Sequence, residues 1–280
     1  MNLTLVYNGV VMFGEHRGEM MDLQLDGKVA VITGASKGIG FHTALKLVQE
    51  GANVVLAARG EKQLQVAAEC IKQETGKEVL IVPTDVSKEI DCKNLIENTI
   101  KHYGRLDILV NNAGTSSANS FESVSTQLWQ SDLDLKVFGA IHCSRFAVPH
   151  MRLVGGGAIV NVTAVLGKTP PANSLPTSVS RAAGLALTKA MSKDLGKENI
   201  RVNSVCIGLV RSDQIERKWR NEAPHLTWEE YSKEVGKTIP LGRVGDAEEA
   251  ANVIAFLVSG AASYVTGSTL NLDGGSGHAL

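Results

Sequence analysis

The chain has 280 residues, of which 44% are hydrophobic, and its formal net charge at pH 7 is −1. This length and apolar fraction are enough for one large α/β core, and the near-neutral charge argues against a nucleic-acid-binding surface or an acidic disordered tail. The four cysteines, at 70, 92, 143 and 206, form no CxxC pair and lack the spacing of metal ligands. We therefore expect a reduced, cytoplasmic protein without a bound metal.

Residues 1–20 precede the first clear strand pattern. Their apolar run, 3–13, is too short to cross a bilayer, and neither a positively charged n-region nor a cleavage site accompanies it. We expect 1–20 to be a disordered lead, or the product of a start that precedes Met20 or Met21, and 21–280 to form one domain. No membrane partner is predicted.

Seven short apolar runs then alternate with segments of helical periodicity. The runs are rich in Val, Ile and Leu, as strands covered on both faces are, and we expect them at 29–33, 53–58, 79–85, 106–114, 158–164, 201–208 and 268–275. The segments between them are expected to be helical, starting with 38–50, 62–75 and 88–103. This alternation predicts an α/β fold with one doubly wound, Rossmann-type parallel sheet and helices on both faces.

The first strand runs directly into TGASKGIG, 33–40, where a helix is expected to begin. Glycines permit a tight turn and a close approach of the backbone to a ligand, and the helix N-terminus offers free N–H groups to a pyrophosphate. A glycine-rich turn alone is also compatible with a plain connection between strand and helix. The flanking strand and helix favour a nucleotide site, to which Thr84–Asp85 and Asn111–Gly114, at the ends of other strands, would contribute.

TGASKGIG, NNAG at 111–114, AIVNV at 158–162, IRVNSV at 200–205 and YVTGSTLNLDGG at 264–275 together resemble the classical short-chain dehydrogenase/reductase family, including its 3-oxoacyl-ACP reductase-like members. The resemblance covers about 24–275. It implies an NAD(P) cofactor, a small-molecule substrate and a homodimer or homotetramer. The residues that it places at the cofactor are Gly34, Ser36, Lys37, Gly38, Ile39, Gly40, Arg59, Asp85, Val86, Asn112, Ala113, Gly114 and Arg181.

The end of the second strand indicates which nucleotide is bound. NAD-specific sites of this type place an acid there to bind the ribose 2′-OH. Here the position is Ala58, followed by Arg59, and Lys37 lies in the glycine loop. Two cations without a carboxylate suit a 2′-phosphate, so we expect NADP rather than NAD. The alternative for Arg59 is a solvated residue at the start of a helix.

The resemblance also shows that the catalytic tetrad of the family is replaced. The family uses a Ser that binds the substrate oxygen, a Tyr that donates the proton, a Lys that lowers the pKa of the Tyr and an Asn that supports a water. This chain has, in the same order, Ala164, Thr177, Arg181 and Lys136. A Thr hydroxyl is too weak an acid to replace a Tyr, and Arg stays protonated. The usual route of ketone reduction is therefore not expected.

Lys136 is the residue that could supply a new acid or base. Apolar residues at Leu133, Val137 and Ile141 predict that its helix turns one face inward, and a buried Lys can have a strongly lowered pKa. Lys136 could equally pair with Asp132 or Asp134. Lys168, just after the fifth strand, would either reach the mouth of the site or be solvated.

The segment 211–240 is expected to form the substrate loop. Its aromatic side chains would either cover a substrate, with Tyr231 as a further proton donor, or pack in a helix pair or an oligomer contact. Three functions remain open: a divergent NADP-dependent oxidoreductase acting on a carbonyl or alcohol, a lyase or isomerase with structural NADP and Lys136 as its base, and a catalytically inactive binding subunit. The family resemblance favours the first.

Overall fold

The computed structural model describes residues 6–7, 10–11 and 21–279. The predicted lead, 1–20, thus lies largely outside the described residues. Within it, β1 (Val6–Tyr7) and β2 (Val10–Val11) form an antiparallel pair. The prediction of disorder for 1–20 therefore stays a prediction.

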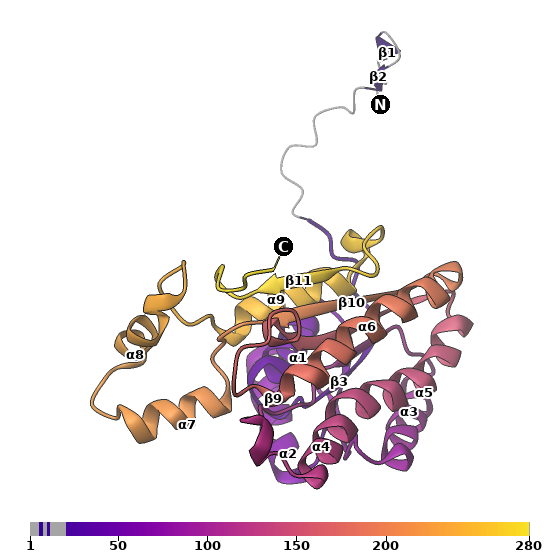
Figure 1. The fold of residues 1–280 in the computed structure, drawn as a ribbon. Coiled ribbons are helices and arrows are strands. Elements are labelled where there is room, and N and C mark those ends of the chain that lie inside the picture. The colour runs from indigo at the N-terminus through magenta and orange to yellow at the C-terminus, as the bar shows by residue number, and fades with distance from the viewer. Residues whose placement is uncertain (1–5, 8–9, 12–20, 280) are drawn as a thin grey trace.

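A parallel sheet of seven strands forms the centre of the molecule (Figure 1). In sheet order the strands are β11 (Thr269–Leu272), β10 (Ile200–Ile207), β8 (Gly157–Ala164), β6 (Ile108–Asn111), β3 (Val29–Thr33), β4 (Asn53–Ala58) and β5 (Leu80–Pro83). The order reverses between β3 and β6, and such a reversal opens a crevice at the carboxyl ends of the strands. The predicted doubly wound fold is confirmed.

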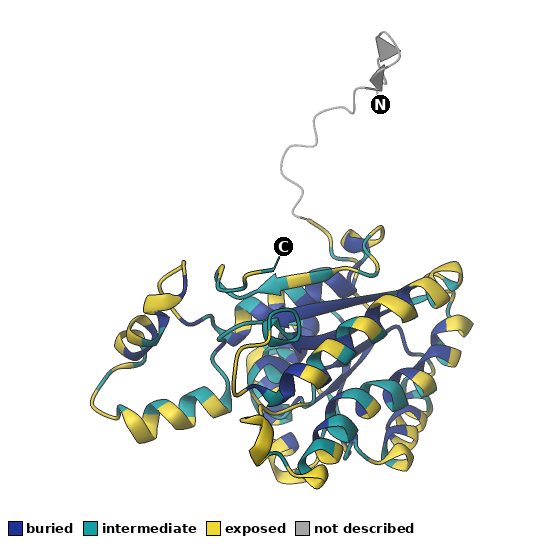
Figure 2. Ribbon diagram, in the orientation of Figure 1, coloured by how far each residue is buried: buried dark blue, intermediate teal, exposed yellow. Residues whose placement is uncertain are grey.

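Helices cover both faces of this sheet. On one face lie α1 (Gly38–Gln49), α2 (Glu61–Thr75) and α9 (Ala247–Val258). On the other face lie α3 (Glu89–Tyr103), α5 (Gly139–Leu153) and α6 (Thr177–Leu195). The side chains of β3 alternate accordingly, since Ala30 and Ile32 join the first core and Val29 and Val31 the second. The sheet is buried throughout its middle (Figure 2).

Several short elements connect these layers. Helix α4 (Thr126–Leu133) continues through a π-helical turn, η2 (Asp134–Phe138), into α5. Strand β7 (Ala118–Asn119) pairs antiparallel with β9 (Leu175–Pro176). The 3-10 turns are η1 (Phe121–Ser123), η3 (Val165–Gly167), η4 (Gly196–Glu198), η5 (Gly236–Thr238) and η6 (Gly260–Ala262).

Two helices project from the side of the body, α7 (Asp213–Glu222) and α8 (Trp228–Val235), and we call them the lid (Figure 1). They occupy the segment predicted to be the substrate loop. Most of their surface is exposed or half-exposed (Figure 2). Across the described ranges, no helix is both long enough and apolar enough to cross a membrane.

Candidate active site

The glycine loop joins β3 to α1 and is shaped by close backbone contacts. Gly34 has φ +66° and Gly38 has φ +58°, a region that L side chains rarely adopt. A Cβ atom on Gly40 would lie 2.4 Å from the Gly34 carbonyl oxygen. Asn112 secures the turn, because its Nδ2 donates to the carbonyl oxygens of Thr33 at 2.9 Å and of Gly34 at 3.2 Å. The loop is therefore held in one shape before any ligand binds.

The N-terminus of α1 has the features of an anion site. Three other helices begin with a side-chain cap, from Ser125, Ser212 and Thr227, whereas α1 has neither a cap nor an acidic residue in its first turn. Its first N–H groups are thus left for a ligand. No atom of another described residue lies within 4 Å of where a Cβ on Gly38 would be. A nucleotide pyrophosphate fits this opening.

The predicted contacts with the nucleoside lie around the glycine loop. Ser36 is half-buried and Arg59 is exposed. The Asp85 carboxylate is engaged in its own turn, where it accepts hydrogen bonds from the Ser87 N–H at 3.2 Å and from the Ser87 hydroxyl at 2.7 Å. Val86 is buried, with 5% of its surface exposed. Within the described part of the chain, Arg59 forms no ion pair, so its guanidinium is available to a phosphate.

Other predicted contacts have a structural role as well. The side chain of Ile39 is buried in the core beneath α1. The Ala113 N–H donates to the Thr33 hydroxyl at 3.0 Å. Gly114 lies against a guanidinium, since a Cβ atom there would be 3.0 Å from Nη2 of Arg181. Gly114 therefore places the predicted nucleotide cradle next to Arg181, one of the substituted catalytic residues.

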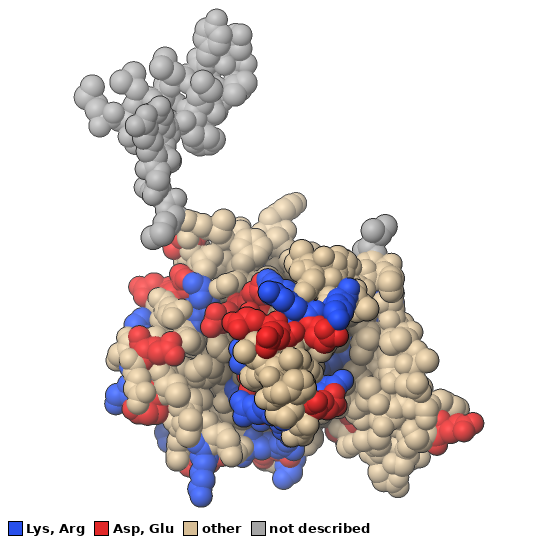
Figure 3. Space-filling model, turned by 90° about the vertical axis from the view of Figure 1, so that its left-hand side faces the viewer, with Lys and Arg blue, Asp and Glu red and all other residues tan. Residues whose placement is uncertain are grey.

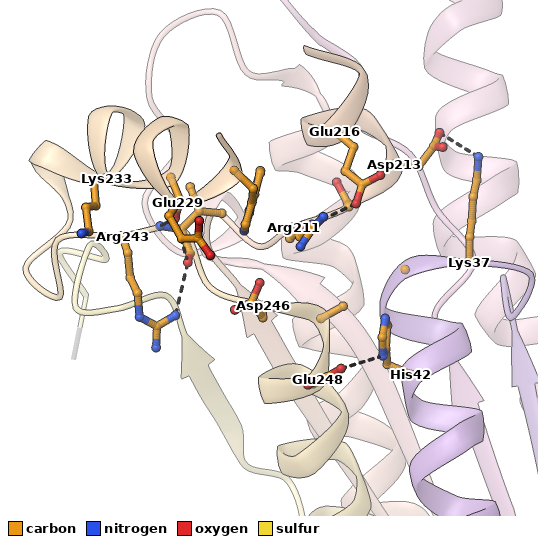
Figure 4. Close-up of a pocket in the computed structure, with 16 residues that line it drawn as sticks. Lys37, His42, Arg211, Asp213, Glu216, Glu229, Lys233, Arg243, Asp246 and Glu248 are labelled. Carbon is orange, nitrogen blue, oxygen red and sulfur yellow. Dashed lines mark hydrogen bonds and ion pairs between the residues drawn. The ribbon is translucent and has the colours of Figure 1, made fainter. Parts of the chain in front are cut away.

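Lys37 extends from the glycine loop toward the lid. Its Nζ lies 2.7 Å from Oδ2 of Asp213 on α7 (Figure 4). Both residues line a pocket of about 640 Å³ between α1, the lid and the N-terminus of α9. Other charges in this pocket are also paired, such as Arg211 with Glu216 at 2.9 Å. Acidic and basic side chains are accordingly interspersed on this side of the molecule (Figure 3).

Lys136 lies in the π-helical turn η2, a rare geometry that often marks functional sites. Its side chain is 1% exposed, and its ammonium donates hydrogen bonds to the Asp132 carboxylate and, at 3.0 Å, to the Thr177 hydroxyl. Of the two predicted carboxylate partners the structure therefore selects Asp132. Asp134 instead accepts a hydrogen bond from Gln130 at 2.7 Å.

The environment of Lys136 changes its acidity. Burial lowers the pKa of its ammonium to about 8; the Arg181 guanidinium contributes to the lowering, and the Asp132 carboxylate opposes it. The second oxygen of that carboxylate is buried without a partner among the described residues. The structure thus shows the alternative of a pair with Asp132, and an acid or base role of Lys136 stays a prediction.

Thr177 is the first residue of α6 and is 3% exposed. Its hydroxyl donates to the Ser117 carbonyl oxygen at 2.9 Å, and it accepts from the Ser117 N–H at 2.8 Å and from Lys136. One donated and two accepted bonds exhaust the capacity of a hydroxyl. Thr177 therefore links Lys136 to the loop after β6 and has no free proton of its own.

Arg181 lies one turn along α6 and binds the end of β8. Its Nη1 donates to the Val162 carbonyl oxygen at 2.7 Å, while its Nε is buried without a partner among the described residues. Ala164, at the position of the family's Ser, offers no side-chain donor. Lys168 is half-buried, and its Nζ donates to the Asn271 side chain at 2.6 Å on β11.

A small cavity of about 20 Å³ separates Lys136 from Arg181. Its walls are mixed: Thr33, Asn111 and Asn161 are polar, and Val86, Leu135 and Val162 are apolar. Oδ1 of Asn111 is buried and has no partner among the described residues. The cavity is large enough for about one water molecule. It connects the buried lysine with the side of the site on which the glycine loop lies.

The aromatic side chains of the lid pack against one another. The ring centroid of Trp228 lies 5.6 Å from that of Trp219 and 6.0 Å from that of Tyr231. Tyr231 is 5% exposed, so its ring belongs to this cluster and is not presented as a proton donor. The Arg211 guanidinium covers Trp228, with its Cζ 4.4 Å from the ring centroid. The alternative of a packed helix pair is the one that the structure supports.

Sequence reasoning missed two participants in these sites, Ser117 and Asp213. Ser117 acts through its backbone, which no residue pattern reveals. Asp213 follows the helix-capping Ser212, and an acid there has the ordinary explanation of stabilising a helix N-terminus. Only the fold brings it to Lys37.

Comparison with known proteins agrees with this geometry. A family model described as "Enoyl-(Acyl carrier protein) reductase" matches residues 34–277. A protein named "Uncharacterized oxidoreductase" from Thermotoga maritima is 36% identical over 254 residues, which are 91% of this chain and 99% of the relative.

Two solved structures are similar over nearly the whole chain. L-sorbose reductase from Gluconobacter frateurii, complexed with NADPH and L-sorbose, is 35% identical with a TM-score of 0.87, covering 93% of this chain and all of that one. A short-chain oxidoreductase from Pseudomonas aeruginosa PAO1, bound to NADPH and described as containing an atypical catalytic center, is 32% identical with a TM-score of 0.87, covering 92% of this chain and 99% of that one. The prediction of NADP agrees with these NADPH complexes.

Proposed function

The chain belongs to the short-chain dehydrogenase/reductase family of NAD(P)-dependent oxidoreductases, and on this premise we propose that it interconverts a carbonyl compound and an alcohol with NADP, using Lys136 to handle the proton. The observation that carries the proposal is the hydrogen bond of 3.0 Å from Lys136 to Thr177, at the position of the family's proton donor. A pKa of about 8 makes Lys136 a usable acid at neutral pH.

In the proposed reaction, residues of the chain transfer the proton and stabilise charge. Bound NADPH would supply the hydride to the carbonyl carbon. As the carbonyl oxygen becomes an alkoxide, it would replace the Ser117 carbonyl oxygen as the acceptor of the Thr177 hydroxyl. Thr177 would pass its proton to that oxygen and take one from Lys136, so the hydroxyl never has to ionise. Lys136 is left neutral beside Asp132 and regains its proton from water. Arg181 keeps a fixed positive charge nearby.

The choice of NADP rests on charge. Lys37 and Arg59 are cations at the edge of the nucleotide cradle, and Ala58 stands where an NAD-specific site has an acid. The remaining predicted cradle residues, from Gly34 to Gly40 and from Asn112 to Gly114, surround the uncapped start of α1. We expect NADPH to bind at least about tenfold more tightly than NADH.

A second function, NADP binding without turnover, is favoured by one observation. The side chain of Lys136 is 1% exposed and the hydroxyl of Thr177 is fully bonded within the protein. A subunit that binds nucleotide and substrate without reaction would need no more than this closed arrangement.

Single-turnover transfer from 4-deuterated NADPH to a panel of ketones and 3-oxoacyl thioesters separates these functions. Deuterium in the alcohol product supports the oxidoreductase, and Lys136→Met should then slow the transfer by about 10²- to 10⁴-fold while NADPH affinity is kept. Lys168→Met is the matched control and should leave the rate unchanged. Substrate conversion without deuterium would indicate a lyase or isomerase, and no conversion at all would indicate the binding subunit.

A further inference from the structure

Lys37 is shared between the nucleotide cradle and the lid. Its backbone is part of the glycine loop, and its ammonium lies 2.7 Å from the Asp213 carboxylate at the start of α7 (Figure 4). The Lys37 side chain is 60% exposed and that of Asp213 is 34% exposed, so an incoming anion can reach the pair. Hydrogen bonding from Lys37 also lowers the pKa of Asp213, which is therefore charged at neutral pH.

The pair is asymmetric. Asp213 has a second cation, Arg217, whose Nη2 lies 3.0 Å from the same oxygen. In the described part of the chain Lys37 has no second carboxylate. If Lys37 leaves, the Asp213 carboxylate stays paired, whereas the ammonium needs a new anion. If Lys37 leaves Asp213 for another anion, the lid therefore loses little electrostatic stabilisation.

Few other contacts join α7 to the body. At the root of the lid, the Arg211 N–H donates to the Gly245 carbonyl oxygen at 2.7 Å, beside a bridge between Val210 and Gly245. Farther along, Gln214 accepts a hydrogen bond of 3.3 Å from the Ser116 N–H. The pair of Lys37 and Asp213 is therefore a direct connection between the lid and the glycine loop.

We propose that Asp213 is a positioning residue that holds the Lys37 ammonium on the lid until the 2′-phosphate of NADP takes it over. The proposal rests on the assignment of NADP in the proposed function and adds that Asp213 sets the preference for it. Binding of NADPH then exchanges a lid contact for a phosphate contact and loosens the start of α7. NADH has no 2′-phosphate and leaves the pair intact.

The effect is expected to be small, because both partners are exposed. Ion pairs of this kind alter an equilibrium by about two- to fivefold. Asp213→Asn should therefore tighten NADPH binding by about two- to fivefold and leave NADH binding unchanged. Glu216→Gln is the matched control: it also removes a carboxylate from α7, but the partners of Glu216 are Arg211, at the root of the lid, and Arg220 on α7. It should alter neither affinity.

Isothermal titration of the full-length chain with each nucleotide, at one ionic strength, measures these affinities. Lys37→Met should weaken NADPH selectively, and adding Asp213→Asn to it should have no further effect. An unchanged NADPH affinity in Asp213→Asn, or an equal gain for both nucleotides, would overturn the proposal. Because titration needs no turnover, a failure of deuteride transfer contradicts the proposed reaction and leaves this result standing.

Hydrogen exchange tests the proposal separately, because a purely structural role of Asp213 would not make exchange depend on which nucleotide is bound. In the wild-type chain, NADPH but not NADH should speed exchange of the first amides of α7. In Asp213→Asn these amides should exchange fast without nucleotide. Slower exchange on NADPH binding in the wild type would show that the nucleotide fastens the lid and would contradict the proposed release.

Discussion

The Lys136 side chain is 1% exposed, and the hydrogen bonds that it makes among the described residues go to Asp132 and Thr177. If it is the acid of reduction, its protonated form limits the rate. With a pKa of about 8, the kcat for reduction should be level at lower pH and fall as pH rises through about 8. Asp132 favours the charged form, so Asp132→Asn should move this fall to lower pH. A pH profile of kcat in both proteins measures the shift, and identical profiles would contradict it.

Thr177 can be tested separately from Lys136. Thr177→Val removes the partner of the buried Lys136 ammonium and of the Ser117 N–H, and a buried unsatisfied donor costs about 1–3 kcal/mol. We expect the free energy of unfolding from urea titration to fall by that amount and hydride transfer to slow. Thr177→Ser keeps the hydroxyl and should restore both properties. Full stability of Thr177→Val would show that the three-way hydrogen bonding is not formed.

At the residue scale the sequence left two interpretations of Lys136, a buried acid or base and a partner of a carboxylate, with Asp132 and Asp134 as the two candidate carboxylates. Helical spacing favours Asp132, since residues four apart share a face whereas residues two apart do not. What the sequence could not show is that Lys136 also meets Thr177, because that contact depends on how α6 packs beside the π-helical turn. The role of Ser117 was hidden for the same reason.

At the scale of elements, α1 depends on the glycine packing that precedes it. A Cβ atom on Gly40 would lie 2.4 Å from the Gly34 carbonyl oxygen and 2.6 Å from Nδ2 of Asn112. Gly40→Ala must therefore displace the loop, at a cost of about 1–3 kcal/mol. We expect NADPH affinity to fall by about tenfold or more in calorimetric titration. Gly196→Ala, where no described atom lies within 4 Å of the new methyl group, should bind as the wild type does.

Strands were the elements that the sequence predicted best, because continuous Val, Ile and Leu runs leave little choice in a buried parallel sheet. Their ends were less accurate: Thr84 and Asp85 were placed in a strand, but β5 stops at Pro83 and they turn into the crevice. The spacing of Leu133, Val137 and Ile141 predicted one helix around Lys136, yet this region consists of α4, the π-helical turn and α5. A π-helical turn has no residue signature, so only the structure reveals it.

At the scale of the whole molecule, the core reaches close to the start of the continuously described segment, 21–279. Met21 is 71% exposed, and Leu25, at 2% exposed, joins the core. We expect a chain of residues 21–280 to keep the Tm of the full chain and the predicted homodimer or homotetramer. Thermal unfolding and sedimentation equilibrium of both chains measure this. A lower Tm for 21–280 would show that 1–20 contribute to the fold.

The overall architecture followed from local patterns, since strands alternating with helices have few ways to pack. The pairing of Lys37 with Asp213 could not be predicted in this way, because the two residues lie far apart in the sequence. Such contacts depend on the position of the lid. The sequence could predict that Lys37 and Arg59 lie near a phosphate. It could not predict that Asp213 pairs with Lys37 in the absence of nucleotide.

The aromatic cluster of α7 and α8 has a practical consequence for spectroscopy. Two of the three tryptophans of the chain, Trp219 and Trp228, lie in the lid, and the third is Trp129 on α4. Two of the three indoles therefore lie in the lid, and reduced nicotinamide absorbs in the spectral region in which indoles emit. Energy transfer from these indoles to NADPH would report the distance between the lid and the cofactor without any added dye. Changes in the position of the lid on nucleotide binding can thus be followed by the fluorescence of the unlabelled protein.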